Sequence, residues 1–167
     1  MSRQQQARDW ANAVLADEQA IIIDTETTGL SRYDEVVEIG IINSRGETVL
    51  NTLVKPQRSI HYHAWRVHGI NTSMCADAPT FAQLYDQLTE IFTAASRIII
   101  YNVSFDKRLL NQSCQQHGLS PFDFPPHQLQ CAMKMYAQLV GRSRRLNGGH
   151  RALGDCIATL KLIKSMS

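Results

Sequence analysis

The sequence predicts one α/β domain over residues 1–167, built on a mixed β-sheet with helices on both faces. Three strand-like runs come first and are close enough along the chain to form an antiparallel meander. Helical and strand-like segments then alternate, which is typical of parallel strands joined by helices. The length fits a single domain, and a hydrophobic content of 44% supplies enough apolar surface for its core.

The first half of the chain predicts a helix and the three strands of the meander. Residues 1–18 carry apolar side chains at helical spacing and are expected to form a helix packed on the domain. The β-branched run 20–26 is typical of a buried strand. Residues 36–43 and 48–55 are the next two strands, and the Ser-Arg-Gly-Glu segment at 44–47 is the turn of an antiparallel hairpin.

The second half predicts two further strands, each followed by a helix. Apolar residues recur every three or four positions over 81–92 after the capping residue Thr80, which indicates a helix. Residues 97–101 form a fourth strand, and 104–117 the helix that follows it. Residues 129–140 contain a short fifth strand and another helix. The fourth and fifth strands are expected to be the parallel part of the sheet.

A last helix is expected after the glycine pair at 148–149. Its core-facing residues are predicted from their spacing to be Leu153, Ile157, Leu160 and Ile163.

The charges are divided unevenly along the chain. The formal net charge is only +2, which by itself indicates neither a strongly basic nucleic-acid binder nor an acidic tail. Residues 1–106 hold eight basic and thirteen acidic side chains, however, whereas residues 107–167 hold nine basic and two acidic ones. The basic excess therefore lies in the second half.

The cysteines and the apolar runs predict where the protein works. The four cysteines form no C-x-x-C pair, so neither a zinc ribbon nor a disulfide-rich secreted scaffold is indicated. The N-terminus lacks the apolar stretch of a signal peptide, and the longest aliphatic runs are too short to span a bilayer. We expect a soluble cytoplasmic protein that does not bind membranes.

Two acids end the first strand. Side chains two positions apart in a strand project to the same side, so Asp24 and Glu26 form a carboxylate pair. Such a pair after an aliphatic run is costly unless a cation lies between its members, and Mg²⁺ or Mn²⁺ are the cations that oxygen ligands favour. Two solvated acids at a strand end are the alternative interpretation.

Three further residues are candidates for the same site. Asp106 comes early in the helix after the fourth strand, where a capping role is the alternative, because acids in a first helical turn are stabilising. His150 and Asp155 are five positions apart, about 140° on an ideal helix, so both cannot face one point from mid-helix. His150 is therefore expected just before the helix, after the flexible glycines; an ordinary surface histidine is the alternative.

Three motifs occur in order along the chain: D-x-E on the first strand, N-x-x-F-D after the fourth strand and H-x-x-x-x-D at the last helix. With these motifs the sequence resembles the DEDDh family of 3′–5′ exonucleases. This family includes the proofreading subunit of bacterial replicative DNA polymerase, RNase T and oligoribonuclease. The likeness extends from Ile21 to about Ile163, and it includes Glu38-Ile39-Gly40 and His68-Gly69-Ile70. It implies an RNase H-like fold and hydrolysis of phosphodiester bonds from a 3′ end.

The resemblance also implies a role for each signature residue. Two Mg²⁺ or Mn²⁺ ions would neutralise the phosphodiester, activate a water molecule and stabilise the leaving oxygen. Asp24 would bridge the ions, Glu26 and Asp155 would help to hold the ion on the side of the nucleophile, and Asp106 would support the other. His150 would act as the general base, since histidine titrates near neutral pH.

Substrate contacts are expected by the same resemblance from Thr27, Thr28, Leu30, His68, Asn102 and Phe105. The two threonines would meet the terminal 3′ hydroxyl or the bound phosphate, and Leu30 would wedge beside the terminal bases. Apolar contact with base faces tolerates any sequence. Core packing with Leu109 is the alternative for Phe105, and simple filling of a loop is the alternative for Leu30.

Three arginines precede the Gly-Gly-His segment: Arg142, Arg144 and Arg145. They predict an electrostatic rim that holds the phosphate backbone and weakens with salt. A solvated basic loop is the alternative.

The sequence as a whole predicts a metal-dependent 3′–5′ exonuclease that releases nucleoside 5′-monophosphates from single-stranded or frayed DNA. An exoribonuclease is the alternative within the class, because no residue is seen to recognise a 2′ hydroxyl. A nucleic-acid-binding subunit with the same fold and no turnover is the alternative outside it. Only a short segment follows the last helix, so we expect no polymerase-tethering tail, and a stable polymerase association is unsupported.

Overall fold

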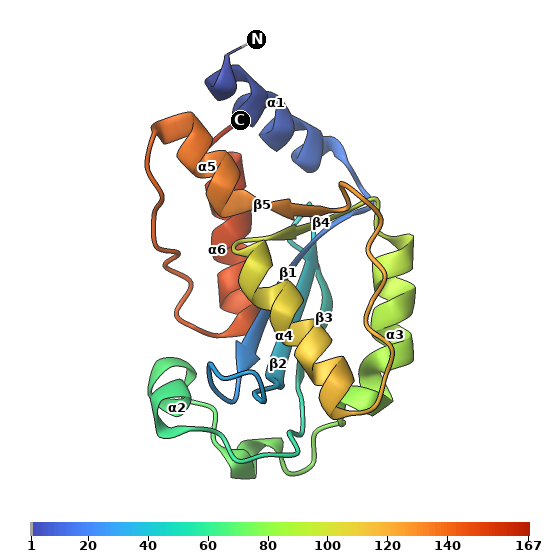
Figure 1. The fold of residues 1–167 in the computed structure, drawn as a ribbon. Helices are drawn as coiled ribbons and strands as arrows, with labels where there is room; N and C mark the ends of the chain where they lie inside the picture. The colour runs from blue at the N-terminus through green and yellow to red at the C-terminus, as the bar shows by residue number, and fades with distance from the viewer. Residues whose placement is uncertain (1) are drawn as a thin grey trace.

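The computed structural model describes residues 2–167, which form a five-stranded mixed sheet in the order β3-β2-β1-β4-β5 (Figure 1). β1 pairs antiparallel with β2, and β2 pairs antiparallel with β3. β4 lies parallel to β1 on its other side, and β5 lies parallel to β4. The predicted meander and parallel pair are confirmed. The strands are β1 (Ala20–Thr27), β2 (Val36–Asn43), β3 (Thr48–Leu53), β4 (Arg97–Ile100) and β5 (Leu129–Cys131).

Helices cover both faces of this sheet (Figure 1). One face packs against α3 (Phe81–Ala94) and α4 (Val103–Gln116), the other against α1 (Arg3–Ala16), α5 (Ala132–Val140) and α6 (Ala152–Lys164). Two elements that the sequence did not predict, α2 (Tyr62–His68) and the 3₁₀-helix η1 (Thr72–Cys75), lie in the connection from β3 to α3. Among residues 2–167, none of the helices is both long and apolar enough to cross a membrane.

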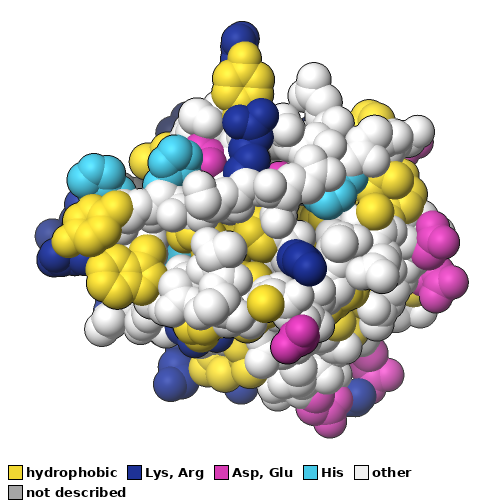
Figure 2. Space-filling model, turned by 90° about the horizontal axis from the view of Figure 1, so that it is seen from below, with side chains coloured by type: hydrophobic (Ala, Val, Ile, Leu, Met, Phe, Trp, Pro, Cys, Tyr) yellow, Lys and Arg dark blue, Asp and Glu magenta, His cyan; other side chains and the backbone are white. Residues whose placement is uncertain are grey.

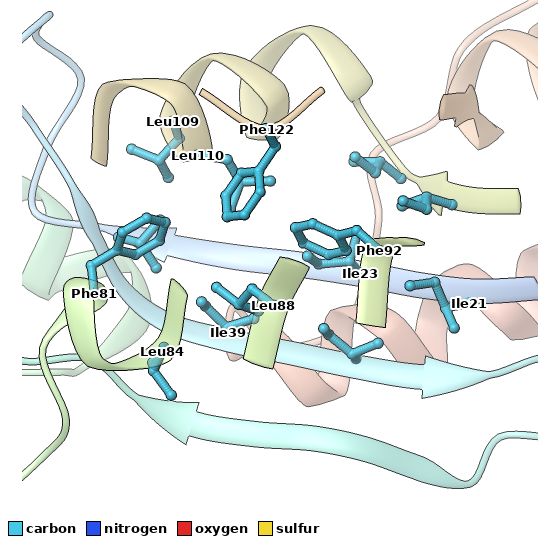
Figure 3. Close-up of a cluster of buried hydrophobic side chains, with 14 of the residues drawn as sticks. Ile21, Ile23, Ile39, Phe81, Leu84, Leu88, Phe92, Leu109, Leu110 and Phe122 are labelled. Carbon is cyan, nitrogen blue, oxygen red and sulfur yellow. The ribbon is translucent and has the colours of Figure 1, made fainter. Parts of the chain in front are cut away.

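The alternation of side chains along β1 determines where its acids point. Ile21 and Ile23 pack into the core under α3 and α4 (Figure 3), whereas Ile22 packs into the core under α1 and α6. Successive side chains of a strand point to opposite faces, so Asp24 projects to the side of α6 and Thr25 to the side of α4. β1 thus presents its acids to the helix that carries Asp155.

A glycine in β2 lets α6 approach the sheet closely. Gly40 pairs with Asp24 across the sheet, and a Cβ atom at Gly40 would lie 2.7 Å from the Ala152 carbonyl carbon and from the Leu153 nitrogen. Both are backbone atoms of the first turn of α6, so they cannot turn aside as a side chain would. The absence of a side chain at Gly40 therefore brings the start of α6 onto the strand beside the acids.

Gly40→Ala is expected to lower the free energy of unfolding by about 1–3 kcal/mol, the usual cost of overpacking a core. Urea unfolding measures this loss. Asn51→Ala is the control, because Asn51 lies opposite Gly40 on β3 and is exposed; we expect a change of at most about 0.5 kcal/mol there. Unchanged stability in Gly40→Ala would contradict the close contact between β2 and α6.

The structure corrects the predicted core face of α6. Ile157 was expected in the core but is 38% exposed, whereas Ala152, Cys156, Leu160 and Ile163 are buried. The contact at Gly40 fixes the rotation of the helix with Ala152 against the sheet, and the residues four, eight and eleven positions later then follow on the same face.

Candidate active site

Three carboxylates from two distant parts of the chain meet at the end of β1. One oxygen from each of Asp24, Glu26 and Asp155 lies within 4.8 Å of the others. Asp24 and Glu26 come from β1, and Asp155 comes from the first turn of α6. They line a cavity of about 580 Å³, here called the acidic cavity. The structure thus brings the predicted carboxylate pair together with the acid of the last helix.

Asp106 lines the same cavity from the side of α4. Its Oδ1 atom accepts hydrogen bonds from the Thr25 backbone nitrogen at 3.2 Å and the Thr25 hydroxyl at 2.8 Å. β1 pairs with β4 only as far as Ile23, so the backbone nitrogen of Thr25 bonds to Asp106 and not to β4. Asp106 therefore links the start of α4 to the end of β1 and stands apart from the group of three.

These carboxylates oppose one another's ionisation. Burial raises the pKa of Glu26 to about 8, and the charge of Asp155 adds to this effect. Burial also raises the pKa of Asp106 to about 7, although the hydrogen bonds from Thr25 act in the opposite direction. The pKa of Asp24 is raised well above its ordinary value by burial and then by the charge of Asp106. Burial and mutual repulsion therefore both favour the protonated forms of these carboxyl groups.

The donor set of the cavity fits a hard divalent cation. Burial raises the pKa of Asp155, and its Oδ1 atom is buried without a hydrogen-bond partner among residues 2–167. Buried polar atoms are normally satisfied, and an unpartnered carboxylate oxygen beside two other carboxylates fits a cation as its partner. Carboxylate oxygens are the ligands that Mg²⁺ and Mn²⁺ prefer.

His150 lies just before α6 and lines the acidic cavity, the position expected from its spacing to Asp155. The His150 backbone is left-handed, with φ of 56°, and His150 lies close enough to Asp155 to oppose the rise in the pKa of that carboxyl. A Cβ atom at Gly148 would lie 1.9 Å from Asp155 Oδ1. Only glycine allows the loop to cross this acid and carry His150 to the cavity.

Glu38 is a buried acid next to the site, and its contacts were not predicted from the sequence. It lies opposite Glu26 on β2, and its carboxylate binds the Arg151 guanidinium with the shortest N–O distance at 2.6 Å. The Ala152 backbone nitrogen donates to the same carboxylate at 2.9 Å. Glu38 therefore caps α6 and holds the residue that follows His150. An acid within the apolar run Val36–Ile42 was the available signal, since buried acids need a partner.

The predicted nucleotide contacts divide between two cavities. Asn102 and Phe105 line the acidic cavity. Leu30, Thr27 and His68 line a second, mostly apolar cavity of about 440 Å³, here called the apolar cavity, which shares Glu26 and Phe105 with the first. Leu30 is 74% exposed, which does not fit the alternative of a loop filler. The end of the molecule that carries α2 exposes hydrophobic and histidine side chains close together (Figure 2).

Three of the predicted contact residues form hydrogen bonds within the protein itself. The Thr27 hydroxyl donates to the Gly29 carbonyl oxygen at 2.7 Å and accepts from the Gly29 backbone nitrogen at 3.2 Å. His68 places Nε2 2.9 Å from the Thr27 carbonyl oxygen and accepts from the Ile70 backbone nitrogen at Nδ1, so neither ring nitrogen is left for a nucleotide. The Thr28 side chain is fully buried, and its hydroxyl donates to Asp34 at 2.6 Å. The expected contact between Thr28 and a 3′ hydroxyl or phosphate is therefore corrected: Thr28 holds the loop that carries Leu30.

The three arginines also divide. Arg144 and Arg145 line the acidic cavity, whereas Arg142 is exposed and is absent from its lining. Among the three, only Arg144 and Arg145 line the cavity that holds the carboxylates.

The sequence matches those of known exonucleases over nearly its whole length. The RNase_T exonuclease family model covers residues 21–163. An uncharacterized exonuclease, CP81 of Escherichia phage 186, is 34% identical over 98% of this chain and 93% of its own length. The DNA polymerase III subunit epsilon of Rickettsia conorii is 36% identical over 54% of this chain and 42% of its own length.

Solved structures agree with this match. Exonuclease X in complex with 5′-overhanging duplex DNA is 27% identical, with a TM-score of 0.60, over 89% of this chain and 92% of that one. E. coli Exonuclease I in complex with a dA16 oligonucleotide has a TM-score of 0.72 over 89% of this chain and 41% of that one; at 19% identity it supports the fold alone. The family model and the relatives together show that this chain belongs to the DEDDh-type 3′–5′ exonucleases.

Proposed function

We propose that this exonuclease removes nucleotides from the 3′ ends of single-stranded or frayed DNA and releases nucleoside 5′-monophosphates. The observation that carries the proposal is the convergence of four carboxylates and His150 on one cavity that adjoins an apolar cavity. The first arrangement suits a phosphodiester and the second suits a nucleoside.

The carboxylates are proposed to hold two Mg²⁺ or Mn²⁺ ions, with Asp24, Glu26 and Asp155 as ligands of one and Asp24 and Asp106 as ligands of the other. The support is the donor set and the unpartnered Asp155 oxygen. Bound divalent ions would supply neutralisation of the phosphate and a water molecule that ionises near neutral pH.

The protein's own groups would orient the substrate and move the proton. Leu30 and Phe105 would hold the terminal nucleoside by apolar contact in a sequence-independent way. Asn102 caps α4 without a side-chain hydrogen bond to the helix, so its amide is available to the substrate. His150, beside the carboxylates, would accept the proton of the attacking water as general base.

The stability of the metal-free protein is expected to fall between about pH 5 and pH 8. In this interval the folded protein keeps protons on Glu26 and Asp106 that the unfolded chain, with ordinary acidic groups, has lost. The folded state binds more protons, so rising pH favours unfolding. The gain in Tm from Mg²⁺ should increase over the same interval, because metal ligands must be deprotonated. Thermal unfolding in EDTA and in excess MgCl₂ measures both trends; a gain independent of pH would contradict this site.

Neutralising all three arginines, as Arg142→Gln, Arg144→Gln and Arg145→Gln, is expected to raise KM and flatten its dependence on salt. Each phosphate contact that is lost removes about 0.7 from the slope of log affinity against log salt on single strands. Initial rates over a salt series measure the slope. Arg142→Gln alone should leave most of it, since Arg142 does not line the cavity. An unchanged slope in the triple variant would refute the rim.

The choice of DNA is favoured by the DNA polymerase III relatives and by Exonuclease X, which was solved with DNA. A time course on DNA and RNA oligonucleotides of identical sequence, with chromatography of the products, tests it. We expect faster loss of DNA and release of 5′-monophosphates; faster loss of RNA would establish the exoribonuclease instead.

No polymerase partner is proposed, because the DNA polymerase III epsilon relative of Rickettsia conorii matches only 54% of this chain. The cytoplasmic location expected from the sequence stays a prediction.

A further inference from the structure

A third cavity, of about 240 Å³, shares lining residues with the acidic cavity and none with the apolar cavity. It lies between α6 and the loop that joins α5 to α6, the orange segment at the left of Figure 1. Tyr101, Arg144, Arg145 and Leu146 line both this cavity and the acidic one, whereas Lys161 lines only this one. We call it the cationic cavity. It is continuous in its lining with the site of hydrolysis.

The charge of this cavity is positive and uncompensated. Arg144, Arg145 and Lys161 line it, and no Asp or Glu does. None of the three forms an ion pair within residues 2–167. Arginines and lysines that converge on a cavity without acidic partners favour an anion, and they are the side chains that bind phosphate.

A tyrosine at the junction of the two cavities lacks a partner. The Tyr101 hydroxyl is buried without a hydrogen bond within residues 2–167, and Arg144 is close enough for its charge to act on that hydroxyl. Buried tyrosine hydroxyls usually find an acceptor. An anion held by Arg144 would bring oxygen acceptors to this position.

The order of the three cavities matches the order of groups along a nucleic acid. The apolar cavity shares Glu26 and Phe105 with the acidic cavity, which shares Tyr101 and Arg144 with the cationic one. With the terminal nucleoside in the apolar cavity and the scissile phosphate at the carboxylates, the strand continues in the 5′ direction. The next phosphate along the strand would then reach the cationic cavity.

We propose that the cationic cavity binds the second phosphate from the 3′ end of the substrate, and that Tyr101 and Lys161 are substrate-binding residues for it. This inference rests on the proposed 3′–5′ exonuclease function. In long strands that phosphate is an internal phosphodiester, and in a dinucleotide it can only be a 5′-terminal phosphate. A terminal phosphate carries between one and two negative charges at neutral pH, so either chemistry supplies the anion.

The test compares three short substrates with the same 3′ end: TpT, pTpT and TpTpT. TpT lacks the second phosphate, pTpT carries it as a terminal group, and TpTpT carries it as a phosphodiester. We expect kcat/KM for pTpT and TpTpT to exceed that for TpT by about 10- to 100-fold, the range that one or more charge-assisted hydrogen bonds supply. A long oligonucleotide is measured beside them.

Substitutions locate the effect. Lys161→Gln and Tyr101→Phe should each reduce the ratio of pTpT to TpT, and Lys161→Gln should reduce it more, because it removes a full charge. Lys164→Gln is the matched control: Lys164 is an exposed lysine one turn further along α6, outside the lining of the cavity, and its substitution should leave the ratio unchanged.

The outcomes separate this inference from the proposed function. If the long oligonucleotide is not degraded from its 3′ end, the proposed function fails. If it is degraded but TpT and pTpT are cut equally well, the phosphate subsite is refuted. A high ratio that Lys161→Gln and Tyr101→Phe leave unchanged also refutes it, since the phosphate is then bound elsewhere.

Discussion

Asp24→Asn is expected to lower kcat for release of the 3′ nucleotide by more than about 100-fold. Changing a residue that only hydrogen-bonds to a metal ligand costs up to about 100-fold, and Asp24 is proposed to be a ligand itself. Asp24 is proposed as a ligand of both ions. It lies beside Glu26 and Asp155, and the charge of the nearby Asp106 raises the pKa of Asp24. An amide of the same shape removes the negative charge without creating a cavity. Initial rates on a 5′-labelled oligonucleotide in Mg²⁺ measure the loss.

The same variant should be more stable than the unchanged protein when metal is absent. At about pH 8 the ionisation of the buried Asp24 carboxyl is opposed by burial and by its acidic neighbours, whereas the amide that replaces it in the variant does not ionise. Thermal unfolding in EDTA tests this, and it separates loss of chemistry from loss of fold. Asp86→Asn, on the exposed side of α3, is the control for both measurements. Turnover retained in Asp24→Asn would contradict the proposed role of this carboxylate.

Glu38→Ala is expected to lower the free energy of unfolding by about 2 kcal/mol and to slow turnover as well. The substitution leaves the Ala152 amide without its acceptor and Arg151 without its carboxylate. Loss of a fully buried partner costs more, about 3–5 kcal/mol, but the Arg151 side chain is 46% exposed and water replaces part of the interaction. Urea unfolding gives the stability, and kcat gives the effect on the site.

Glu38→Gln distinguishes the cap from the ion pair. Its amide oxygen can still accept from Ala152, while the charge that holds Arg151 is gone. We expect an intermediate loss of stability and a kcat closer to that of the unchanged enzyme. If Glu38→Ala loses stability with kcat unaltered, Glu38 supports only the fold and does not position His150.

The strands and most of the helices could be predicted because their signals are local. The β-branched runs in β1, β2 and β4 are typical of buried strands, and Thr80 with Gln83 forms the capping box that begins α3. The pair Asp24 and Glu26 followed from strand alternation alone. The position of His150 ahead of α6 followed from its angular separation from Asp155.

The features that escaped prediction depend on contacts between distant segments. The short helix α2 has no apolar periodicity to announce it, and it exposes Tyr62 and Val67. The rotation of α6 depends on the space left by Gly40. Thr28 and Asp34, six residues apart, bond only once the loop between them folds back. The pairing of Glu38 with Arg151 spans 113 residues, and no sequence period links them.

The most direct test of the proposed chemistry is a time course on a 5′-labelled single-stranded DNA in Mg²⁺ and in EDTA, with a circular single strand of the same composition. We expect a ladder that shortens from the 3′ end in Mg²⁺, no cleavage in EDTA and an intact circle, because the carboxylates need a divalent cation and the apolar cavity needs a terminal nucleoside. A ladder that persists in EDTA, or cleavage of the circle, would contradict the assignment of the acidic and apolar cavities.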